Sequence, residues 1–332
     1  MNKNIERKLY SDPVPVETLI NALEEKETDY HDDTIDSGKL FMDSTTGNMV
    51  VKNGSYSYDE YPMQDQAQQM LLMKLRMPHS YAKRCPTELL SENVNHWLAQ
   101  YQKQLFVRFD RNEIRSVLTP KYNPVSNLEI VKRLYENSNY QDLTVRYEVT
   151  PSRFVAQFIS PEKAEGVQVG DPCQYGIHLC NSETGYSSVR VKGLILRLIC
   201  QNGLVSPVTH NSWSRTHRSQ SEVILEELES TIETVNTELP RVLQAFYKTR
   251  EILLPKPREI IEGISAKFKL SKIQQEEVQN NLTGNSLYNV INAYTHAGSH
   301  QNQLTLKARE ELQEIGGQLI SMDRSLLEKL AA

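Results

Sequence analysis

Apolar positions along the chain follow two different periods, and the change between them comes near residue 218. In LTVRYEV (143–149) the apolar residues alternate with Thr144, Arg146 and Glu148, which is the two-residue period of a half-buried strand. Beyond residue 218 apolar residues recur only every three or four positions, as they do on one face of a helix. The pattern therefore predicts an α+β protein, with strands in the middle of the chain and a helical C-terminal region.

Short turns, rather than helices, separate most of the predicted strands, and this favours an antiparallel β-sheet flanked by helices. Two runs with a β-strand pattern flank Thr46-Gly47-Asn48, a sequence typical of a tight turn, so a first hairpin is expected within 39–58. Gly193 lies inside one predicted strand, where a bulge or a close backbone approach is expected. The remaining strands are predicted at 143–149, 153–159, 173–180 and 187–200.

Helical periodicity and capping residues predict most of the helices. Ser126, Ser219 and Ser271 each precede a Glu or Gln by three residues, which is the pattern of a capping box. Pro240 falls inside an apolar seam that runs through 228–246, so we expect the helix there to be kinked or split. The other helices are predicted at 62–76, 87–102, 126–134, 256–268, 271–282, 285–297 and 303–320.

These elements suggest an order of regions along the chain. An acidic N-terminal segment with a helix and a loop (1–37) precedes an α+β core (38–205), and a loop rich in His, Trp and Arg (206–218) leads to the helical region (219–332). We expect the helices of the last region to cover the sheet rather than to form a separate domain.

Charge and cysteine content narrow the class of protein. The 332 residues carry a formal net charge of −5, but residues 1–60 hold 6 basic and 13 acidic residues, whereas 74–150 hold 12 basic and 8 acidic ones. No apolar run approaches the roughly 20 residues of a membrane span, and the N-terminus lacks the apolar stretch of a secretory signal. The four cysteines show no Cys-x-x-Cys spacing, so reduced thiols are expected. A cytoplasmic protein without membrane contact is the resulting expectation.

Basic residues on the predicted strands are one candidate for function. Val189 and Val191 point to one side of their strand, which leaves Arg190 and Lys192 on the other. Cations on a sheet, with aromatic residues near them, can follow the phosphates of an unpaired polynucleotide and stack its bases. The alternative is an ordinary charged face in contact with water. The candidate residues of this group are Arg108, Arg111, Arg115, Lys121, Tyr122, Arg146, Arg190, Lys192 and Arg197.

The loop 206–218 is a second candidate, because a loop of this length between a strand and a helix often has a function. Trp213 offers a stacking surface, and Arg215, His217 and Arg218 suit phosphate or base edges. A structural surface loop is an equal alternative, and a metal site with His210 and His217 is a third that lacks further ligands.

A pair of histidines near the C-terminus is a further candidate for a metal site. His296 and His300 are four residues apart and share a helix face only if the helix continues past Gly298, which commonly ends helices. A polar helix end is therefore expected here, and no metal and no cofactor is predicted.

Motifs of the common enzyme classes are missing: the sequence has no P-loop, no Rossmann glycine cluster, no Gly-x-Ser-x-Gly and no zinc-binding helix. Three functions stay open. The first is non-catalytic binding or annealing of single-stranded DNA or RNA, in a homo-oligomer. The second is binding of a host protein through the acidic run at 24–36 and the helical region. The third is a hydrolase or nuclease in which His217 and His296 meet.

Segments in one order along the chain carry a resemblance to a known family. They are KLRMPHSYAKRC, ENVNHWL, IRSVLTPKYNPVSN, NSETGYSSVRVKGLILRLICQNGL, THRSQ and NVINAYTHAGSH, and they lie between about 65 and 300. Together they resemble the phage- and plasmid-like proteins of domain-of-unknown-function family 932. The residues that match the family's patterns are Arg115, Tyr122, Asn127, Asn181, Gly185, Arg197, Cys200, Asn202, Gly203, His217, Asn292, Thr295 and His296.

This resemblance implies a mobile-element setting but no chemistry. An antiparallel sheet with helices and basic groups is also similar in architecture to the single-strand annealing proteins of phage recombination. That similarity concerns the fold only, and a fold hosts many functions.

Overall fold

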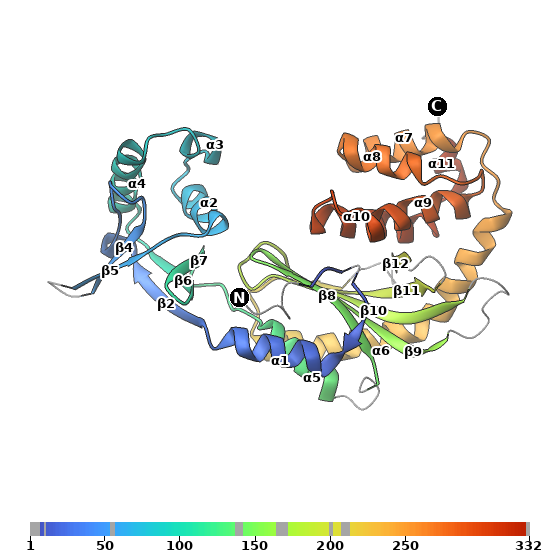
Figure 1. Cartoon of the computed structure of the whole chain (residues 1–332), viewed down its shortest axis with the longest axis horizontal. Helices are drawn as coiled ribbons and strands as arrows, with labels where there is room; N and C mark the ends of the chain where they lie inside the picture. Colours follow the sequence, from blue (N-terminus) through green and yellow to red (C-terminus); the bar gives the residue numbers. More distant parts are fainter. Residues whose placement is uncertain are drawn as a thin grey trace.

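The computed structural model describes residues 7–9, 11–53, 57–136, 142–163, 172–198, 202–206 and 213–329. The chain forms an α+β structure whose apolar residues gather in two large hydrophobic cores, and the ribbon shows two lobes (Figure 1). The smaller lobe is built from residues within 30–118, and the larger one from α1 (Val16–Glu27) and the chain beyond residue 125.

The larger lobe contains a seven-stranded sheet in which every neighbouring pair is antiparallel. Its order is β1-β8-β9-β10-β11-β12, with β13 pairing with β11. The strands are β1 (Val14–Pro15), β8 (Thr144–Thr150), β9 (Arg153–Lys163), β10 (Cys173–Asn181), β11 (Val189–Arg197), β12 (Asn202–Ser206) and β13 (Ser214–Arg215). The strands predicted from alternation are confirmed, because each buries its apolar side.

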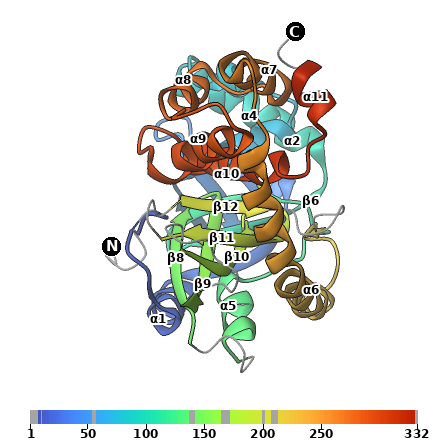
Figure 2. The ribbon, with the colours of Figure 1, turned by 90° about the vertical axis from the view of Figure 1, so that its right-hand side faces the viewer.

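Helices cover both faces of this sheet. The apolar face, with Tyr147, Phe158 and Val191, packs on α1, α5 (Asn127–Glu136) and α6 (Ser221–Lys248). The opposite face packs against α9 (Leu287–His300) and α10 (Leu306–Leu319), which lie above the sheet in both views (Figure 1 and Figure 2). The helical region thus covers the sheet, and the face predicted to be exposed to water is largely enclosed.

Further helices complete this lobe. Helix α6 continues past Pro240, so the predicted split does not occur, and it begins at Ser221 without the capping box expected from Ser219. The capping box at Ser271 is formed. Within the described ranges, none of the helices is at once as long and as apolar as a membrane crossing requires. The remaining elements are α7 (Pro257–Phe268), α8 (Lys272–Asn280), α11 (Arg324–Lys329) and a short 3-10 helix at Thr249–Glu251.

The smaller lobe holds two three-stranded antiparallel sheets, of order β2-β6-β7 and β3-β4-β5, with helices packed on them. Its acidic strand β2 was predicted as a loop, because its sequence lacks alternation, but it pairs along its whole length with β6. The hairpin around residues 46–48 is confirmed. The elements are β2 (Tyr30–Asp36), β3 (Leu40–Met42), β4 (Met49–Asn53), β5 (Ser57–Tyr61), α2 (Asp65–Lys74), α3 (His79–Ala82), α4 (Thr87–Tyr101), β6 (Gln104–Asp110), β7 (Glu113–Leu118) and a 3-10 helix at Ser37–Lys39.

Two hydrophobic cores lie within the region predicted as an α+β core (38–205): buried apolar residues between 35 and 117 form the smaller one, whereas the larger one contains α1 and buried apolar residues from 125 onward. Alternation shows that a strand is half-buried, but it does not show which sheet the strand joins.

Candidate functional site

A buried ion pair lies where the two lobes meet. Arg115 of β7 contacts Glu183 at 2.7 Å, and the two side chains are only 8% and 7% exposed. Glu183 follows β10, and its second carboxylate oxygen accepts a hydrogen bond from the backbone N–H of Asn127, at the start of α5. Burial opposes the charge of Arg115, but Glu183 beside it leaves the pKa of Arg115 raised. One carboxylate thus joins β7, α5 and the end of β10.

Arg108 of β6 reinforces this junction. Its Nε donates to Asp32 of β2 at 2.8 Å, and its Nη1 donates to the backbone carbonyl of Glu183. The ring of Tyr30 lies 3.7 Å from the guanidinium of Arg115, and burial raises the pKa of this tyrosine. The contacts of Arg108, Arg115 and Asp32 therefore stabilise the smaller lobe and its junction with the larger one.

A cavity of about 440 Å³ lies beside this junction. The turn after β10 lines it, together with the loop after β7 and the segment that precedes α6. The lining residues are Thr119, Lys121, Tyr122, Gly185, Tyr186, Ser187, Ser188, Thr216, His217 and Arg218. Gly185 has φ +85°, and a Cβ there would lie 2.6 Å from Leu118, so this turn requires glycine.

Two stacked rings form part of the cavity wall. The rings of Tyr122 and His217 stack with centroids 4.9 Å apart, and the Tyr122 hydroxyl donates to the carbonyl of Ser182 at 2.7 Å. His217 is only 4% exposed, and neither of its ring nitrogens has a hydrogen-bond partner among the described residues. Burial lowers the pKa of His217 from 6.5, although backbone groups of Asn123 and Ser187 near the ring oppose the shift. The ring is therefore neutral at pH 7, and both of its nitrogens are enclosed by the protein.

The cations of the cavity differ from those of the junction. Lys121 and Arg218 are exposed, and neither pairs with a carboxylate in the part of the chain that the structure describes. Asn123 ties the two segments that carry them together: its N–H donates to the carbonyl of His217 at 2.8 Å, and its side chain donates to the carbonyl of Arg218 at 3.2 Å. Two cations, two stacked rings and several hydroxyls thus surround one space.

The other predicted cations have partners elsewhere. Arg111 pairs with Asp29 at 2.9 Å, and Arg215 pairs with Glu227, which also accepts from the indole N–H of Trp213. Arg146 is buried on the sheet face beneath α9 and α10, and Arg197 donates to Asn292 of α9. A continuous cationic track across the sheet is not formed by the residues described, because the opposing helices and loops carry carboxylates for most of these cations. His210 lies outside the described residues.

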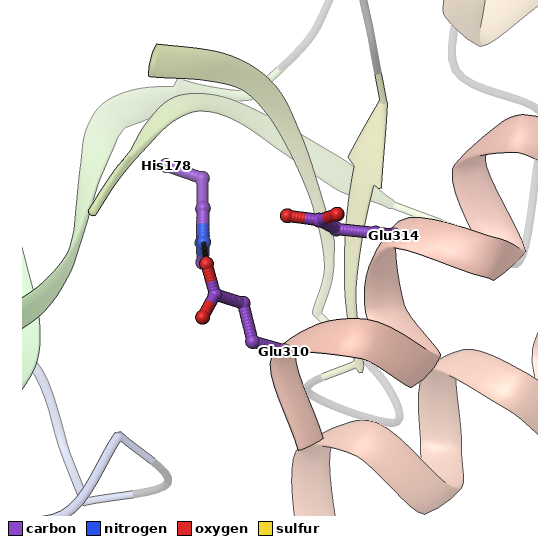
Figure 3. A group of neighbouring side chains, drawn as sticks. All are labelled: His178, Glu310 and Glu314. Atoms are coloured by element: carbon purple, nitrogen blue, oxygen red, sulfur yellow. Dashed lines mark hydrogen bonds and ion pairs between the residues drawn. The ribbon is translucent and has the colours of Figure 1, made fainter. Parts of the chain in front are cut away.

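Arg190 and Lys192 belong to an ionic cluster under α10. Figure 3 shows His178 of β10 facing Glu310 and Glu314, which project from α10 one turn apart. Arg190 contacts Glu310 at 2.8 Å, Lys192 contacts Glu314 at 2.6 Å, and Arg153 also pairs with Glu310. Burial alone would raise the pKa of Glu310, but the contacts with His178, Arg190 and Arg153 lower it to about 2.

The donor atoms of His178, Glu310 and Glu314 lie within 4.8 Å of one another, a spacing that suits a metal ion. Two carboxylates already face three cationic side chains here, however, so a divalent ion would have to displace them at a large electrostatic cost. The cluster is therefore better explained as a set of ion pairs that holds α10 on the sheet than as a metal centre.

Residues that match the family patterns gather in two places. Arg115, Asn127 and Gly185 lie at the lobe junction, where Tyr122, His217 and Asn181 are also found. The second group lies between β12 and α9: Asn202 contacts His300, and Arg197 contacts Asn292. Gly203 and Thr295 pack against α10, whereas Cys200 lies outside the described residues.

The model of one family, described as a domain of unknown function (DUF932), matches residues 115–315. The chain belongs to the DUF932 family. The match begins in β7 and ends in α10, so it contains the cavity, the ionic cluster and the large sheet except β1 of this DUF932 protein, but not the segments at 74–85 and 92–98. No curated protein and no solved structure matches the chain.

The two histidines considered for a hydrolase have different surroundings. His217 stacks on Tyr122, whereas the ring of His296 lies 4.6 Å from that of His300 on α9. In the acidic run considered for a host partner, Asp29 pairs with Arg111 and Asp32 pairs with Arg108, whereas most of its acidic side chains are exposed.

Proposed function

We propose that this DUF932 protein binds single-stranded nucleic acid without catalysis and that the cavity at the lobe junction is its anchor. The observation that carries the proposal is the combination of Lys121 and Arg218, which pair with no carboxylate among the residues described, with the stacked rings of Tyr122 and His217. Binding of unpaired strands relies on cations for the phosphates and aromatic rings for the bases. The protein acts in the cytoplasm of a bacterial host of a phage or plasmid.

The pairing of the other cations limits how the strand is held. Arg115, Arg108 and Lys192 are buried and bonded to carboxylates or carbonyls, so releasing them to phosphates would leave buried carboxylates unpaired. Lys121 and Arg218 are exposed and require no such exchange. We therefore assign phosphate contacts to these two side chains, and stacking of a base to the partly exposed ring of Tyr122.

Salt dependence gives a quantitative test. Each phosphate neutralised on a single strand contributes roughly −0.7 to the slope of log affinity against log salt, so two contacts give a slope of about −1.4. A track of five cations across the sheet would give a slope of roughly −3.5. Fluorescence anisotropy of a labelled 20-nucleotide strand, measured from low to moderate salt, distinguishes the two.

Substitution of the cavity cations tests the same site. In Lys121→Ala and Arg218→Ala the affinity should fall about tenfold each, because each variant loses one charge-assisted phosphate contact. Lys272→Ala removes an exposed cation from α8, far from the residues of the cavity in the sequence, and should bind as the wild type does. Wild-type protein that binds no strand at low salt, or cavity variants that bind as tightly as the wild type, would contradict the proposal.

Strand annealing is the activity that would follow if bases of the bound strand stay accessible. Complementary labelled strands should pair faster in the presence of the protein, and Lys121→Ala with Arg218→Ala should remove the acceleration. Sedimentation with and without DNA measures whether a homo-oligomer forms at the same time.

A further inference from the structure

The cavity at the lobe junction is chemically suited to an anion that also forms hydrogen bonds. Among the described residues that line it, two are cationic, six carry a hydroxyl group and none is acidic. Glu183 lies two residues before Gly185 of the lining, but its two oxygens already bond to Arg115 and to the backbone N–H of Asn127. An anion in this space therefore meets two cations and no carboxylate among the described lining residues.

The size of the cavity is that of a pocket for one small ligand. Its volume of about 440 Å³ lies within the range of roughly 300–1,000 Å³ that is typical of small-molecule sites, which favour junctions between domains. Cations on neighbouring segments do not extend it into a track, because Arg215 pairs with Glu227 and Arg115 pairs with Glu183. A strand bound here is therefore held through the charge of one nucleotide.

The two cations match the charge of a terminal phosphate better than that of an internal one. An internal phosphodiester carries one negative charge, whereas a phosphate monoester carries about −1.5 to −2 at pH 7. Lys121 and Arg218 supply two positive charges, and Asn123 holds the segments that carry them together. One monoester between these side chains would satisfy both of them.

Tyr122 is placed to stack the base of the same nucleotide. It directly follows Lys121 in the sequence, and its hydroxyl donates to the carbonyl of Ser182 at 2.7 Å. The ring of His217 stacks on it with centroids 4.9 Å apart, so the tyrosine ring is held in place. Because this ring is half-buried and lines the cavity, part of it stays accessible to a base. Stacking on an aromatic ring accepts any base, so no sequence preference is expected.

We propose that the cavity binds the phosphate monoester of a nucleotide, so that the protein recognises a single strand at its phosphorylated end. Lys121 and Arg218 hold the phosphate, and Tyr122 stacks the terminal base. Recognition of a strand rests on the proposed function, whereas a free nucleoside monophosphate presents the same group without a strand. The substrate class is thus a linear strand with a terminal phosphate rather than the interior of a strand.

Fluorescence anisotropy with strands of one sequence and about 20 nucleotides tests the end preference. The strands carry a 5′-phosphate, a 3′-phosphate or hydroxyl groups at both ends, and the dye is attached to an internal base. One of the two phosphorylated strands should bind at least about tenfold more tightly than the hydroxyl strand, because the monoester forms charge-assisted contacts with both cations. A circular strand should compete as weakly as the hydroxyl strand. Adenosine 5′- or 3′-monophosphate should displace the phosphorylated strand, whereas adenosine should not.

Variants of the two cations show whether the preference arises in the cavity. Lys121→Ala and Arg218→Ala should each lower it to less than about threefold, because one charge-assisted contact with the monoester is lost. Both side chains are exposed, so these variants should fold as the wild type does, which circular dichroism checks. Lys272→Ala, which removes an exposed cation from α8, should keep the full preference.

The outcomes separate this inference from the proposed function. Equal affinity of the wild type for phosphorylated, hydroxyl and circular strands would overturn the inference and leave the proposed function standing. Binding of adenosine monophosphate that is lost in both cavity variants, with no strand bound at all, would support the ligand of the cavity and contradict the proposed function alone. Binding of neither strands nor nucleotides would contradict both.

Discussion

Arg115 and Arg218 carry the same guanidinium group but lie in different surroundings. Arg115 is buried and bonded to Glu183, whereas Arg218 lines the cavity and is exposed to water. A buried charge is tolerated only with a partner, and an exposed one keeps its capacity for an external anion. At the scale of the residue, burial therefore separates the cations that hold the fold from those available to a ligand.

Glu310 gives a prediction for acid stability. Its pKa is about 2 in the folded protein and 4.5 in the unfolded chain, so it stabilises the fold above pH 4.5, and this contribution is lost as the pH falls toward 2. A shift of this size corresponds to about 3 kcal/mol, of which about 2 kcal/mol is lost by pH 3. Urea unfolding at pH 5.5 and pH 3 should show this loss in the wild type and a smaller one in Glu310→Gln.

Glu276→Gln serves as the control for this measurement, because the side chain of Glu276 is 59% exposed and pairs with Lys272 on α8. It should keep the pH dependence of the wild type. An equal loss of stability in Glu310→Gln and in the wild type would show that Glu310 does not titrate with the predicted low pKa.

Helices α9 and α10 approach each other and β12 more closely than ordinary side chains allow. Gly298 of α9 faces the backbone of α10, and Gly316 of α10 faces Thr295 of α9. Gly317 faces β12, where an added Cβ would lie 2.1 Å from the carbonyl oxygen of Val205. At the scale of the element, these glycines are packing contacts rather than turns.

Gly317→Ala should therefore destabilise the protein, although alanine favours helices by about 1 kcal/mol over glycine. Overpacking of a tight contact costs about 1–3 kcal/mol, and here the obstacle is backbone that cannot rotate away, so we expect a net loss near 2 kcal/mol. Gly38→Ala is the comparison, since no atom lies within 4 Å of an added Cβ there, and it should change the free energy of unfolding by less than about 0.5 kcal/mol. Chemical denaturation of both variants measures the difference, and equal stabilities would contradict this account.

The whole molecule consists of two hydrophobic cores joined by polar contacts. Arg115 and Arg108 reach from the smaller lobe to Glu183, and the Tyr186 hydroxyl donates to the carbonyl of Gln66 in α2 at 2.9 Å. The cavity lies beside this junction, so the relative position of the lobes determines its shape. A change at Glu183 therefore affects both stability and ligand binding.

Glu183→Gln should cost about 3–5 kcal/mol, because it leaves the buried Arg115 without its counter-ion. We expect the smaller lobe to unfold before the larger one, which gives two transitions in denaturant where the wild type shows one. Tryptophan fluorescence follows the smaller lobe through Trp97 and the larger one through Trp213. A single transition with unchanged midpoint would rule out this role for Glu183.

The amino-acid sequence by itself determined most helices and strands of this protein, because periodicity reports which side of an element is apolar. The strand at 143–149 and the helix capped by Ser271 were predictable for this reason. The acidic strand Tyr30–Asp36 was not, because its sequence lacks the alternation of a strand and its hydrogen bonds to β6 hold it extended. Residues of the cavity, such as Tyr122 and His217, were predicted individually as candidates.

Only the tertiary structure decided which of those candidates share a site. Residues 119–122 and 216–218 are far apart in the sequence and meet because Asn123 bonds to the backbone of both His217 and Arg218. The same packing placed carboxylates of α10 opposite Arg190 and Lys192, a contact that local sequence does not encode. The sequence specifies the sign of each charged side chain. Whether that side chain is in contact with water or paired with an opposite charge depends on how distant segments pack.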